Sequence, residues 1–509
     1  MKLGVDIGGT NTDCVLVDRE GKLLYKRKVT TAKNIKDSLD GLLANEELIE
    51  HLKKFCLEAV VIGTTHPLNA VLQGDNLGAT YLIRIDSGTS ESVPPLHSMV
   101  TTLEKSFLGY TSIKGGHLCD GREISPLERV EIEQLVKMIR DKNISNIAIS
   151  SPFSNLYPSH EESVARYIKN EIPGCVVTVS SSICGNALLL RENAAILNTM
   201  LVRDFQNYFS EIESIFRAHN ICVPVYISQN NGTVASAEYA LAHPVSTLSC
   251  GPTNSFVGAA KLANIDEAIV IDVGGTSTDI GIVRKGYPIS TSHHSTISGV
   301  KVGFRMPNVK TIPLGGGSIV RNGEILGKSI GAALQSEGLC FGGKIFTLTD
   351  AAVIKYGLDI GTYMPAVTPH EADLVVLKAK RLIEEQLKKI PRYAELPIIL
   401  VGGGAVVLKN IELLGKKPIY PEAFYCANAY GAAQGEISVT FDKTVQISSA
   451  KNFDSTLEDI QKELESKLTA SGGVVDTFRI IERDITPFHY MTPSSARIKM
   501  TVGGKYSPG

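Results

Sequence analysis

A short motif occurs twice in this chain, and the repeat constrains the fold more than any other feature of the sequence. Residues 5–13 read VDIGGTNTD and residues 271–279 read IDVGGTSTD. An apolar, strand-like segment precedes each copy and another follows it. Because chance recurrence of such a pattern is improbable, the repeat indicates a duplicated supersecondary unit and two similar lobes that face each other.

Each copy of the motif is suited to hold a phosphate group in a strand–turn–strand cradle. The Gly-Gly pair allows a tight turn whose N–H groups a phosphate can approach closely, and the Thr hydroxyls add hydrogen-bond donors. The Asp that ends each preceding strand can hold Mg²⁺ through its waters. The residues assigned to the two cradles are Asp6, Gly8, Gly9, Thr10, Asn11 and Thr12, and Asp272, Gly274, Gly275, Thr276, Ser277 and Thr278.

A single copy of this motif could be only a β-turn, but two copies in similar contexts predict phosphate binding. The sequence contains neither a strand-to-helix P-loop nor a GxGxxG motif that opens a helix after the first strand. We expect Asp6 and Asp272 to hold the magnesium and its waters, and Asp13 and Asp279 to orient the hairpins. The sequence does not identify a general base.

The composition is that of a globular protein without a strongly charged surface. The chain has 509 residues, enough for about three domains of ~150 residues each. Its 51 basic and 53 acidic side chains nearly balance, which argues against a broad surface for nucleic acid or anionic lipid. The first residues run directly into a strand-like segment, so we expect no signal peptide. No apolar stretch reaches ~20 residues, and the nine cysteines are scattered without a CxxC pair. We therefore expect a cytoplasmic protein that binds neither nucleic acid nor a membrane.

The hydrophobic pattern predicts an α/β chain. Residues 2–6, 14–17 and 23–29 are expected to be neighbouring antiparallel strands. Further strands are predicted at 59–62, 79–83, 147–150, 176–179, 268–272 and 278–283, and helices at 37–55, 127–141 and 191–219. The segment from residue 436 has a different texture, with a charged helix at 457–468, and is expected to be a small α+β appendage.

The paired motifs and their spacing resemble the actin–Hsp70–sugar kinase superfamily, in which two ribonuclease-H-like lobes with mixed sheets face each other across an ATP cleft. The resemblance implies ATP and Mg²⁺ as cofactors. It also implies that Gly402, Gly403 and Gly404, which follow an apolar strand, lie against the adenosine, although close helix–strand packing would explain them as well. The small residues at 428–433 would form the helix that closes the lobes together, or an ordinary packed helix.

Several further segments resemble the hydantoinase A/5-oxoprolinase family, which includes N-methylhydantoinase A. They are GTTHPLN at 63–69, GGHLCDGREI at 115–124, Arg191-Glu192 with Asn198, QNNG at 229–232, SCGP at 249–252 and GGGS at 315–318. The ordered set spans about residues 1–435. The chain departs from the family pattern at His66-Pro67, Thr233, Cys250 and within 329–343, and these departures leave the substrate unspecified.

The family resemblance implies an ATP-dependent hydrolase, or a subunit of one, that activates a cyclic amide or related carbonyl by phosphorylation. Phosphorylation turns a carbonyl oxygen, a poor leaving group, into a good one. A hydantoinase B-type subunit is the implied partner, and we expect a homo-oligomer. The implied domains are an N-terminal lobe at 1–185, a second lobe at 186–435 and the C-terminal region at 436–509.

Two other functions stay open at this point. One is a small-molecule kinase of the sugar or acetate kinase type, and the other is an ATP-driven, chaperone-like reactivase. His117 and the His293-His294 pair lack the spacing of zinc ligands and are expected to be surface-loop or core histidines. Cys250 and Cys340 are expected to be buried thiols rather than nucleophiles.

Overall fold

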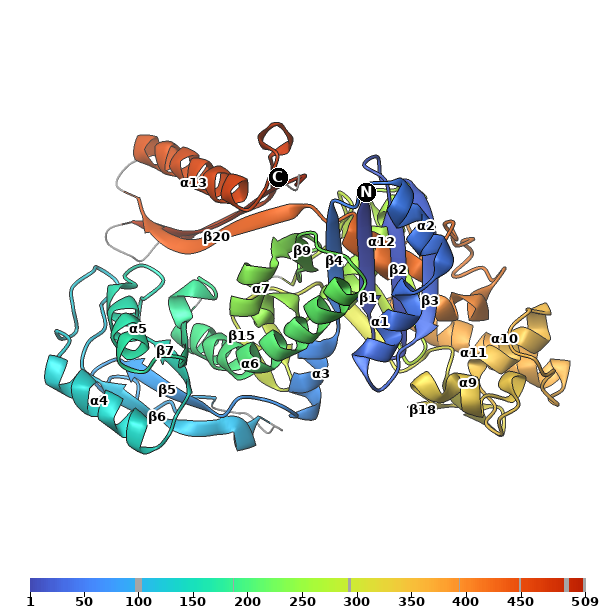
Figure 1. The fold of residues 1–509 in the computed structure, drawn as a ribbon, viewed down its shortest axis with the longest axis horizontal. Coiled ribbons are helices and arrows are strands. Elements are labelled where there is room, and N and C mark those ends of the chain that lie inside the picture. The colour runs from blue at the N-terminus through green and yellow to red at the C-terminus, as the bar shows by residue number, and fades with distance from the viewer. Residues whose placement is uncertain are drawn as a thin grey trace.

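The computed structural model is a mixed α/β fold with several sheets (Figure 1). It describes residues 1–96, 103–185, 187–291, 294–392, 394–447, 450–488 and 494–506. His293 of the predicted histidine pair lies outside these residues. Among the helices described, none combines the length and the apolar character that crossing a bilayer requires.

The first copy of the repeated motif forms a hairpin in a nine-stranded sheet. Strand β1 (Lys2–Ile7) pairs antiparallel with β2 (Asn11–Val17), and β2 pairs antiparallel with β3 (Leu23–Thr30). These three strands confirm the prediction from the hydrophobic pattern. Strand β4 (Ala59–Thr64) lies parallel to β1 on its other side, so the sheet is mixed.

The second copy forms the same arrangement in a separate sheet. Strand β11 (Ala268–Val273) pairs antiparallel with β12 (Thr278–Arg284) and parallel with β19 (Ile398–Val401). Strand β16 (Val309–Ile312) lies antiparallel beside β12, in the position that β3 takes beside β2. The repeat in the sequence is therefore a repeat of at least four strands in space.

Two helices that are rich in small residues pack against each other between these sheets. Helix α8 (Cys250–Ala263) lies on β11 and β19, and helix α12 (Ala427–Ala433) lies on β1, β2 and β4. A Cβ atom at Gly258 would overlap the carbonyl of Ala427, and one at Gly431 would overlap the carbonyl of Asn254. Glycine at both positions therefore allows the close approach that holds the two hairpins near each other.

A third sheet has four parallel strands, β5 (Thr80–Ile85), β6 (Phe107–Ile113), β7 (Asn146–Ser150) and β8 (Val176–Val179). Helices α4 (Arg129–Asp141) and α5 (Ser159–Glu171) connect its strands. The long helix α6 (Leu188–Ala218) runs from this sheet to the nine-stranded sheet, where it packs on α1 (Figure 1).

One predicted helix is wrong. The pattern at 37–55 predicts a single helix, but the structure has α1 (Ile35–Leu43) and α2 (Glu46–Lys54). Asn45 between them has an extended backbone, and its side-chain oxygen accepts a hydrogen bond from Leu48 N. An Asn in this role starts a new helix, so the apolar periodicity continues across the break while the backbone does not.

The C-terminal region has the predicted α+β content, and its strands continue the nine-stranded sheet. The order is β21-β22-β20-β10-β9-β4-β1-β2-β3, with α13 (Ala450–Ala470) packed on β20 and β22. This sheet takes strands from all three predicted domains, whose boundaries at 185 and 435 stay a prediction. The newly named strands are β9 (Val225–Ser228), β10 (Val234–Ser236), β20 (Ile437–Gln446), β21 (Arg479–Phe488) and β22 (Ser495–Gly504).

The remaining elements cover the sheets and complete two apolar cores. One core lies under β1 and β4 against α1 and α6, and the other lies under β11 and β19 against α10 and α11. These elements are α3 (His66–Gln73), α7 (Ala237–Ala242), β13 (Tyr287–Pro288), β14 (Ser295–Ile297), β15 (Val300–Val302), β17 (Ser318–Arg321), β18 (Glu324–Ser329), α9 (Leu334–Glu337), α10 (Leu348–Tyr356) and α11 (Pro369–Leu387).

Candidate active site

A cavity of about 540 Å³ lies between the two hairpins. It brings together most of the residues that the sequence assigned to phosphate, metal and adenosine. Those that line it are Asp6, Gly8, Gly9, Thr10, Asn11, Asp272, Gly274, Gly275, Thr276, Ser277, Gly402 and Gly403. Three assigned residues, Thr12, Thr278 and Gly404, are not among the lining residues.

The first hairpin is a tight turn that is held by hydrogen bonds to its backbone. Gly8 N donates to Asn11 O at 3.0 Å, and Thr31 satisfies the carbonyls of Gly8 and Thr10 through its hydroxyl and its amide at 2.8 and 2.9 Å. In the described part of the chain, the amides of Gly9 and Thr10 donate to no protein acceptor. The turn therefore presents donors to the cavity, as a phosphate cradle requires.

The second hairpin repeats this turn with a different support behind it. Gly274 N donates to Ser277 O at 2.9 Å. The GGGS segment lies behind the turn, where Gly316 N and Gly317 N donate to the carbonyls of Gly274 and Gly275 at 2.9 and 2.8 Å. The tips of the two hairpins come close, with Thr10 Oγ1 and Thr276 Oγ1 3.4 Å apart.

Thr12 and Thr278 support the hairpins from inside instead of lining the cavity. Both side chains are fully buried. Thr12 Oγ1 lies 3.0 Å from Thr31 Oγ1, and Thr278 Oγ1 donates to the carbonyl of Leu314. Their shared position in the repeat therefore gives them a shared structural role.

Four carboxyl groups line the cavity in two cross-strand pairs. Asp6 lies opposite Asp13, and Asp272 lies opposite Asp279. Burial, and next the neighbouring Asp13, raise the pKa of Asp6 to about 7. Burial likewise raises the pKa of Asp13 and of Asp279 to about 6, and raises that of Asp272. Asp13 and Asp279, assigned to orientation alone, thus belong to the same acidic group as the other two.

Lys28 is the one cation among the described residues that line this cavity. Its Nζ lies 3.0 Å from Asp13 Oδ2. Lys28 was not predicted from the sequence as a site residue. The predicted pairing of residues 14–17 with 23–29, extended by one residue, would have placed it beside Asp13. The register sets Lys28 directly opposite Asp13, so the two side chains share a face of the sheet.

The acidic group has the properties of a magnesium site. Asp6 Oδ1 and Asp13 Oδ1 are buried and have no hydrogen-bond partner among the described residues. Four carboxyl groups against one ammonium leave the cavity acidic when they are ionised, and Mg²⁺ prefers such oxygen ligands. The carboxyl groups present therefore fit a divalent cation, and the assignment of Asp6 and Asp272 as its ligands stays a prediction.

A glycine on the neighbouring parallel strand makes room for each key carboxylate. A Cβ atom at Gly63 on β4 would overlap Asp6 Oδ1, and one at Gly402 after β19 would overlap Asp272 Oδ1. Gly402 also has φ +90°, which favours glycine. Gly404 packs directly against the carbonyl of Gly274, in agreement with the packing alternative for this glycine. Gly402 and Gly403 instead line the cavity.

The other family-like segments divide between this cavity and the scaffold. Thr65 and Asn69 of GTTHPLN line the cavity. Asn230 of QNNG accepts from Ser249 N at 2.7 Å and donates to Val245 O at 2.8 Å, which fixes the start of α8. Glu192 forms a buried ion pair with Arg84 of β5, Nε to Oε2 at 2.8 Å, in the four-stranded sheet.

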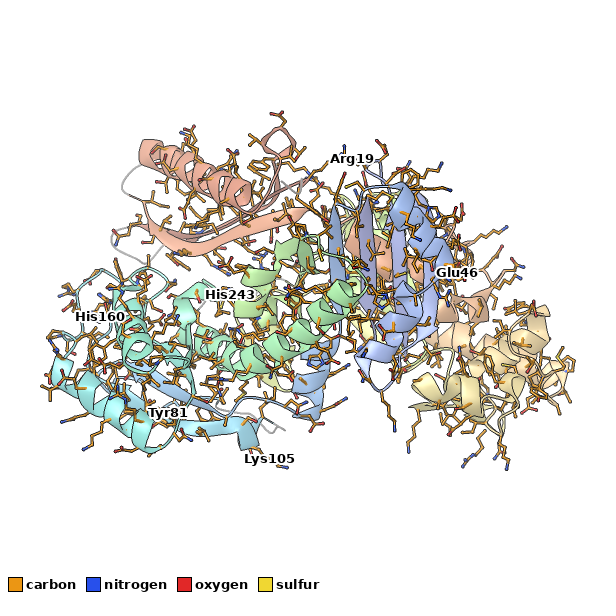
Figure 2. The ribbon with its side chains drawn as sticks, in the orientation of Figure 1. Arg19, Glu46, Tyr81, Lys105, His160 and His243 are labelled. Atoms are coloured by element: carbon orange, nitrogen blue, oxygen red, sulfur yellow. The ribbon has the colours of Figure 1, made fainter. Side chains whose placement is uncertain are left out.

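The cysteines and histidines have structural surroundings. Cys250 and Cys340 are fully buried, and burial raises the pKa of each thiol to about 12, which confirms them as buried thiols. His117 is buried beside His160, which lies far from β1–β3 (Figure 2). One ligand atom each from His117, Glu123 and His160 lies within 4.8 Å of the others.

The hydrogen bonds of His160 explain this histidine cluster without a metal. Its Nδ1 accepts from Gly116 N at 3.0 Å, so the ring proton is on Nε2, which lies 3.2 Å from Glu123 Oε1. A metal-bound imidazole instead donates a proton from its second nitrogen. His160 therefore links two loops by hydrogen bonds. His117 is buried, so of the two predicted environments, surface loop and core, the structure shows the core.

Family models match most of the chain. The model described as hydantoinase/oxoprolinase matches residues 191–410, and the model described as the hydantoinase/oxoprolinase N-terminal region matches residues 2–172. Between them they include both hairpins and most of the lining of the cavity.

Curated relatives and solved structures agree with these models. Caprolactamase subunit alpha from Pseudomonas jessenii is 26% identical over 381 residues, covering 69% of this chain and 53% of that subunit. The acetophenone carboxylase gamma subunit from Aromatoleum aromaticum is 27% identical over 282 residues, covering 52% of this chain and 38% of that subunit. The matches thus span about half or less of these relatives. The ATP-dependent caprolactamase structure from P. jessenii superposes with a TM-score of 0.73 at 19% identity, covering 99% of this chain and 87% of that one, and this likeness shows the fold.

Proposed function

Because the chain belongs to the hydantoinase/oxoprolinase family, we propose that it binds Mg²⁺–ATP between its two hairpins and phosphorylates the carbonyl oxygen of a cyclic amide or a related compound. It would be an ATP-dependent hydrolase or the ATP-using subunit of one. The names of its relatives, caprolactamase, 5-oxoprolinase and acetophenone carboxylase, support a lactam or ketone substrate. The similar caprolactamase structure is described as ATP-dependent, which supports the use of ATP.

One observation carries the proposal: both copies of the repeat present their turns and their carboxyl groups to a single cavity. Phosphoryl transfer needs mainly positioning and neutralisation of charge. The free amides of the turns would bind phosphate oxygens, and Lys28 would offset the charge that builds up on them. Mg²⁺ bound by Asp6 and Asp272 would supply the further positive charge.

The proposed chemistry balances with two waters. The amide oxygen attacks the γ-phosphorus and the bond to ADP breaks, which leaves an O-phosphorylated imidate. Water adds to the activated carbon, the C–N bond breaks, and the amine leaves with a proton. A second water then hydrolyses the acyl phosphate to acid and inorganic phosphate. An amide oxygen needs no base for the first attack, so the carboxyl groups of the cavity would be free to hold Mg²⁺.

A partner subunit is part of this proposal. Several relatives are named as subunits, among them the caprolactamase alpha subunit and the carboxylase gamma subunit. A second polypeptide of the hydantoinase B type would complete the hydrolysis, and this chain would supply the phosphorylated intermediate. We further propose that the chain works as a homo-oligomer.

The test is the ATPase activity of the purified chain with Mg²⁺ and each of 5-oxoproline, hydantoin, N-methylhydantoin and ε-caprolactam. A second series uses acetophenone with bicarbonate. Mass spectrometry of each reaction identifies ring-opened, phosphorylated or carboxylated products. Stimulation by a cyclic amide with ring opening would support the amide reaction, and a stable phosphorylated product would favour a kinase. Failure to bind ATP in the presence of Mg²⁺ would overturn the proposal.

A further inference from the structure

The cavity between the two hairpins has two sides, which the order of the strands defines. In the nine-stranded sheet this order is β4-β1-β2-β3, so the first hairpin has β4 on one side and β3 on the other. Lys28 belongs to β3, and a Cβ atom at Gly403 would lie 3.7 Å from its Nζ. The glycines assigned to the adenosine therefore lie on the β3 side of the first hairpin.

Helix α3 lies on the other side, because it begins two residues after the end of β4. Thr65, Leu68, Asn69 and Gln73 line the cavity from this segment, and we call these four residues the α3 wall. A Cβ atom at Gly9 would lie 3.9 Å from Asn69 Nδ2. The α3 wall thus borders the turn that is proposed to bind phosphate.

The internal repeat makes the α3 wall the counterpart of the adenosine segment. Strands β4 and β19 are equivalent, because each is parallel to the first strand of its hairpin. Gly402 and Gly403 follow β19, and the α3 wall follows β4. A nucleotide that lies against the segment after β19 leaves the α3 wall for the molecule that receives the phosphoryl group.

The α3 wall carries no charged side chain. It presents one hydroxyl group, two carboxamides and the apolar side chain of Leu68. Among the described residues that line the whole cavity, the charged ones are four aspartates and Lys28, which pairs with Asp13 on the β3 side. A substrate carboxylate at the α3 wall would therefore meet like charges and no cation, which disfavours an anionic substrate.

The carboxamide of Asn69 has hydrogen-bonding capacity left for a ligand. Its Nδ2 donates one hydrogen to Thr65 Oγ1 at 3.3 Å and carries a second one. Its Oδ1 accepts no hydrogen bond from the described residues. A lactam ring holds its C=O and N–H on the same edge, so one carboxamide can donate to the first and accept from the second. The carbonyl oxygen keeps a lone pair for attack on phosphorus.

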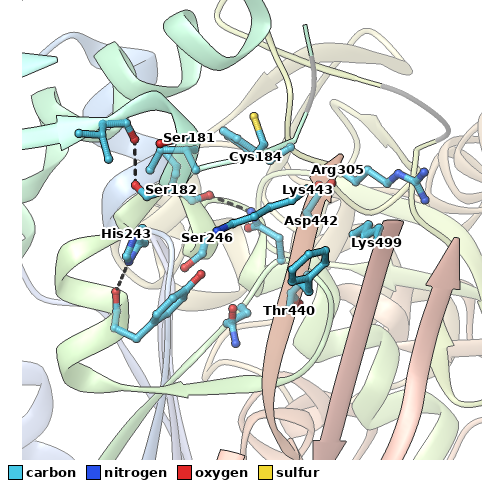
Figure 3. A pocket seen from close by; sticks show the side chains of 18 of the residues that line it. Ser181, Ser182, Cys184, His243, Ser246, Arg305, Thr440, Asp442, Lys443 and Lys499 are labelled. Atoms are coloured by element: carbon cyan, nitrogen blue, oxygen red, sulfur yellow. Dashed lines mark hydrogen bonds between the residues drawn. The ribbon is translucent and has the colours of Figure 1, made fainter. Parts of the chain in front are cut away.

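A different cavity, of about 280 Å³, shows that a neutral wall is not a general property of this molecule (Figure 3). Arg305, Lys443 and Lys499 line it together with Asp442. Cations there stand in the lining itself, whereas the α3 wall offers only neutral groups. The two linings therefore suit ligands of different charge.

We propose that the α3 wall is the substrate subsite, that it selects an uncharged secondary lactam, and that Asn69 recognises the lactam amide. This inference rests on the proposed function and names its substrate class. A few placed polar groups beside an apolar surface are typical of sites for small molecules. An anionic lactam, an N-alkylated lactam and a ketone should all be poorer ligands, because each lacks part of this match.

The test compares four small rings for binding to the full chain loaded with Mg²⁺ and the non-hydrolysable ATP analogue AMP-PNP. 2-Pyrrolidinone is the uncharged lactam, and 5-oxoproline differs from it only by a carboxylate. N-Methyl-2-pyrrolidinone lacks the N–H, and cyclopentanone lacks the nitrogen. Dissociation constants come from ligand-detected NMR titrations. We expect 2-pyrrolidinone to bind at least tenfold more tightly than each of the other three.

Variants of Asn69 separate recognition from folding. Asn69→Leu removes the carboxamide at similar volume and should weaken binding of 2-pyrrolidinone at least tenfold. Asn69→Gln keeps the carboxamide and should retain more of the affinity than Asn69→Leu. Asn207→Leu makes the same change at an exposed residue of α6 that does not line the cavity, and it should leave the affinity unchanged. The melting temperature of each variant shows that it folds.

The outcomes distinguish this inference from the proposed function. A chain that does not bind Mg²⁺ and AMP-PNP overturns the proposed function itself. If the nucleotide binds, three results would overturn the substrate subsite alone. These are binding of 5-oxoproline as tight as that of 2-pyrrolidinone, no binding of any lactam, and equal affinity of Asn69→Leu and the parent chain for 2-pyrrolidinone.

Discussion

In the first hairpin, strand β3 sets Lys28 opposite Asp13, and in the second hairpin, strand β16 sets Thr311 opposite Asp279. The two positions are equivalent in the repeat, because each lies one strand outside the hairpin in the same antiparallel register. Lys28 forms an ion pair with Asp13 at 3.0 Å, whereas Thr311 donates a hydrogen bond to Asp279 at 2.6 Å.

The two copies share one backbone unit and differ in the contacts that support it. Both copies have the tight turn and the opposed carboxyl groups, and in both a glycine makes room for a carboxylate: Gly63 within β4 in the first copy and Gly402 directly after β19 in the second. The first copy adds a positive charge, and Asn428 donates to Asp6 Oδ2 at 3.3 Å. The second copy adds instead the GGGS segment behind its turn. We infer that the first hairpin balances phosphate charge and that the second sets the position of the nucleotide.

The largest expected effect comes from the carboxyl groups that both copies share. Asp6→Asn and Asp272→Asn each remove one proposed magnesium ligand with almost no change in volume. We expect each to lower Mg²⁺-dependent ATPase activity by about 10²–10³-fold, the cost typical of losing a main electrostatic contact in a transition state. Steady-state kinetics over a range of Mg²⁺ concentrations measures this effect.

The control for these variants is Asp37→Asn, on the exposed face of α1. It makes the same chemical change at an exposed residue that does not line the cavity, and it should leave the ATPase activity within twofold of the parent. If only one of Asp6→Asn and Asp272→Asn behaved like this control, the two carboxyl groups would not have equivalent roles in the two hairpins.

Lys28 tests the asymmetry directly. Lys28→Met should lower kcat about 10–100-fold, because it removes the positive charge that the cavity lining supplies and leaves Asp13 without its partner. Thr311→Val, the equivalent change in the second copy, removes only a hydrogen bond to Asp279 and should lower kcat less than about fivefold. Equal effects of the two variants on kcat would contradict separate roles for the hairpins.

The glycines beside Asp6 and Asp272 test whether each carboxylate needs the space that its neighbouring glycine leaves. Gly63→Ala and Gly402→Ala would each place a methyl group on a carboxylate oxygen, and Gly402 has φ +90° in addition. We expect each to lower the free energy of unfolding by about 1–3 kcal/mol, with the larger loss at Gly402. Gly41→Ala on α1 meets no neighbouring atom and should not destabilise the chain. Urea unfolding of the three variants measures the differences, and a neutral Gly402→Ala would show that the carboxylate can move aside.

The sequence predicted the hairpins well because every signal for them is local. The strands and the turn of each hairpin lie next to the motif in the sequence. The second copy of the motif, with strand-like segments on both sides, gave the same prediction again. The shared role of Asp13 and Asp279 followed less directly, because the motif alone does not show that opposed residues of a hairpin face the same side.

Other features depend on contacts between distant residues, which leave little trace in a sequence. The C-terminal strands join the nine-stranded sheet through a single residue pair, Val234 with Ile437. No pattern in the sequence predicted this pairing. Gly63 faces Asp6 only because β4 is parallel to β1. The break at Asn45 was different, since an Asn followed by Glu46 and Glu47 is a helix-start signal that the apolar periodicity outweighed.

The smallest expected effect is a pH dependence that differs between the copies. A carboxyl group with a raised pKa in the folded chain binds more protons when folded than when unfolded. Its contribution to stability is therefore complete below the unfolded value and is lost as the pH rises through the folded value. Burial raises the pKa of Asp6 to about 7 and that of Asp279 to about 6, so the loss should extend to higher pH for Asp6 than for Asp279.

Thermal unfolding of the chain without Mg²⁺ should thus shift to lower temperature between pH 5 and pH 8, on the order of 2–4 °C for each group. Asp6→Asn should flatten the curve mainly between pH 6 and 8, and Asp279→Asn mainly between pH 5 and 7. Because the proposed Mg²⁺ site needs ionised carboxylates, the stabilising effect of Mg²⁺ should be larger at pH 8 than at pH 5.5. A Mg²⁺ effect that does not change with pH would mean that the cation is not held by these groups. Identical pH ranges for the two variants would mean that the pKa of Asp6 does not lie above that of Asp279.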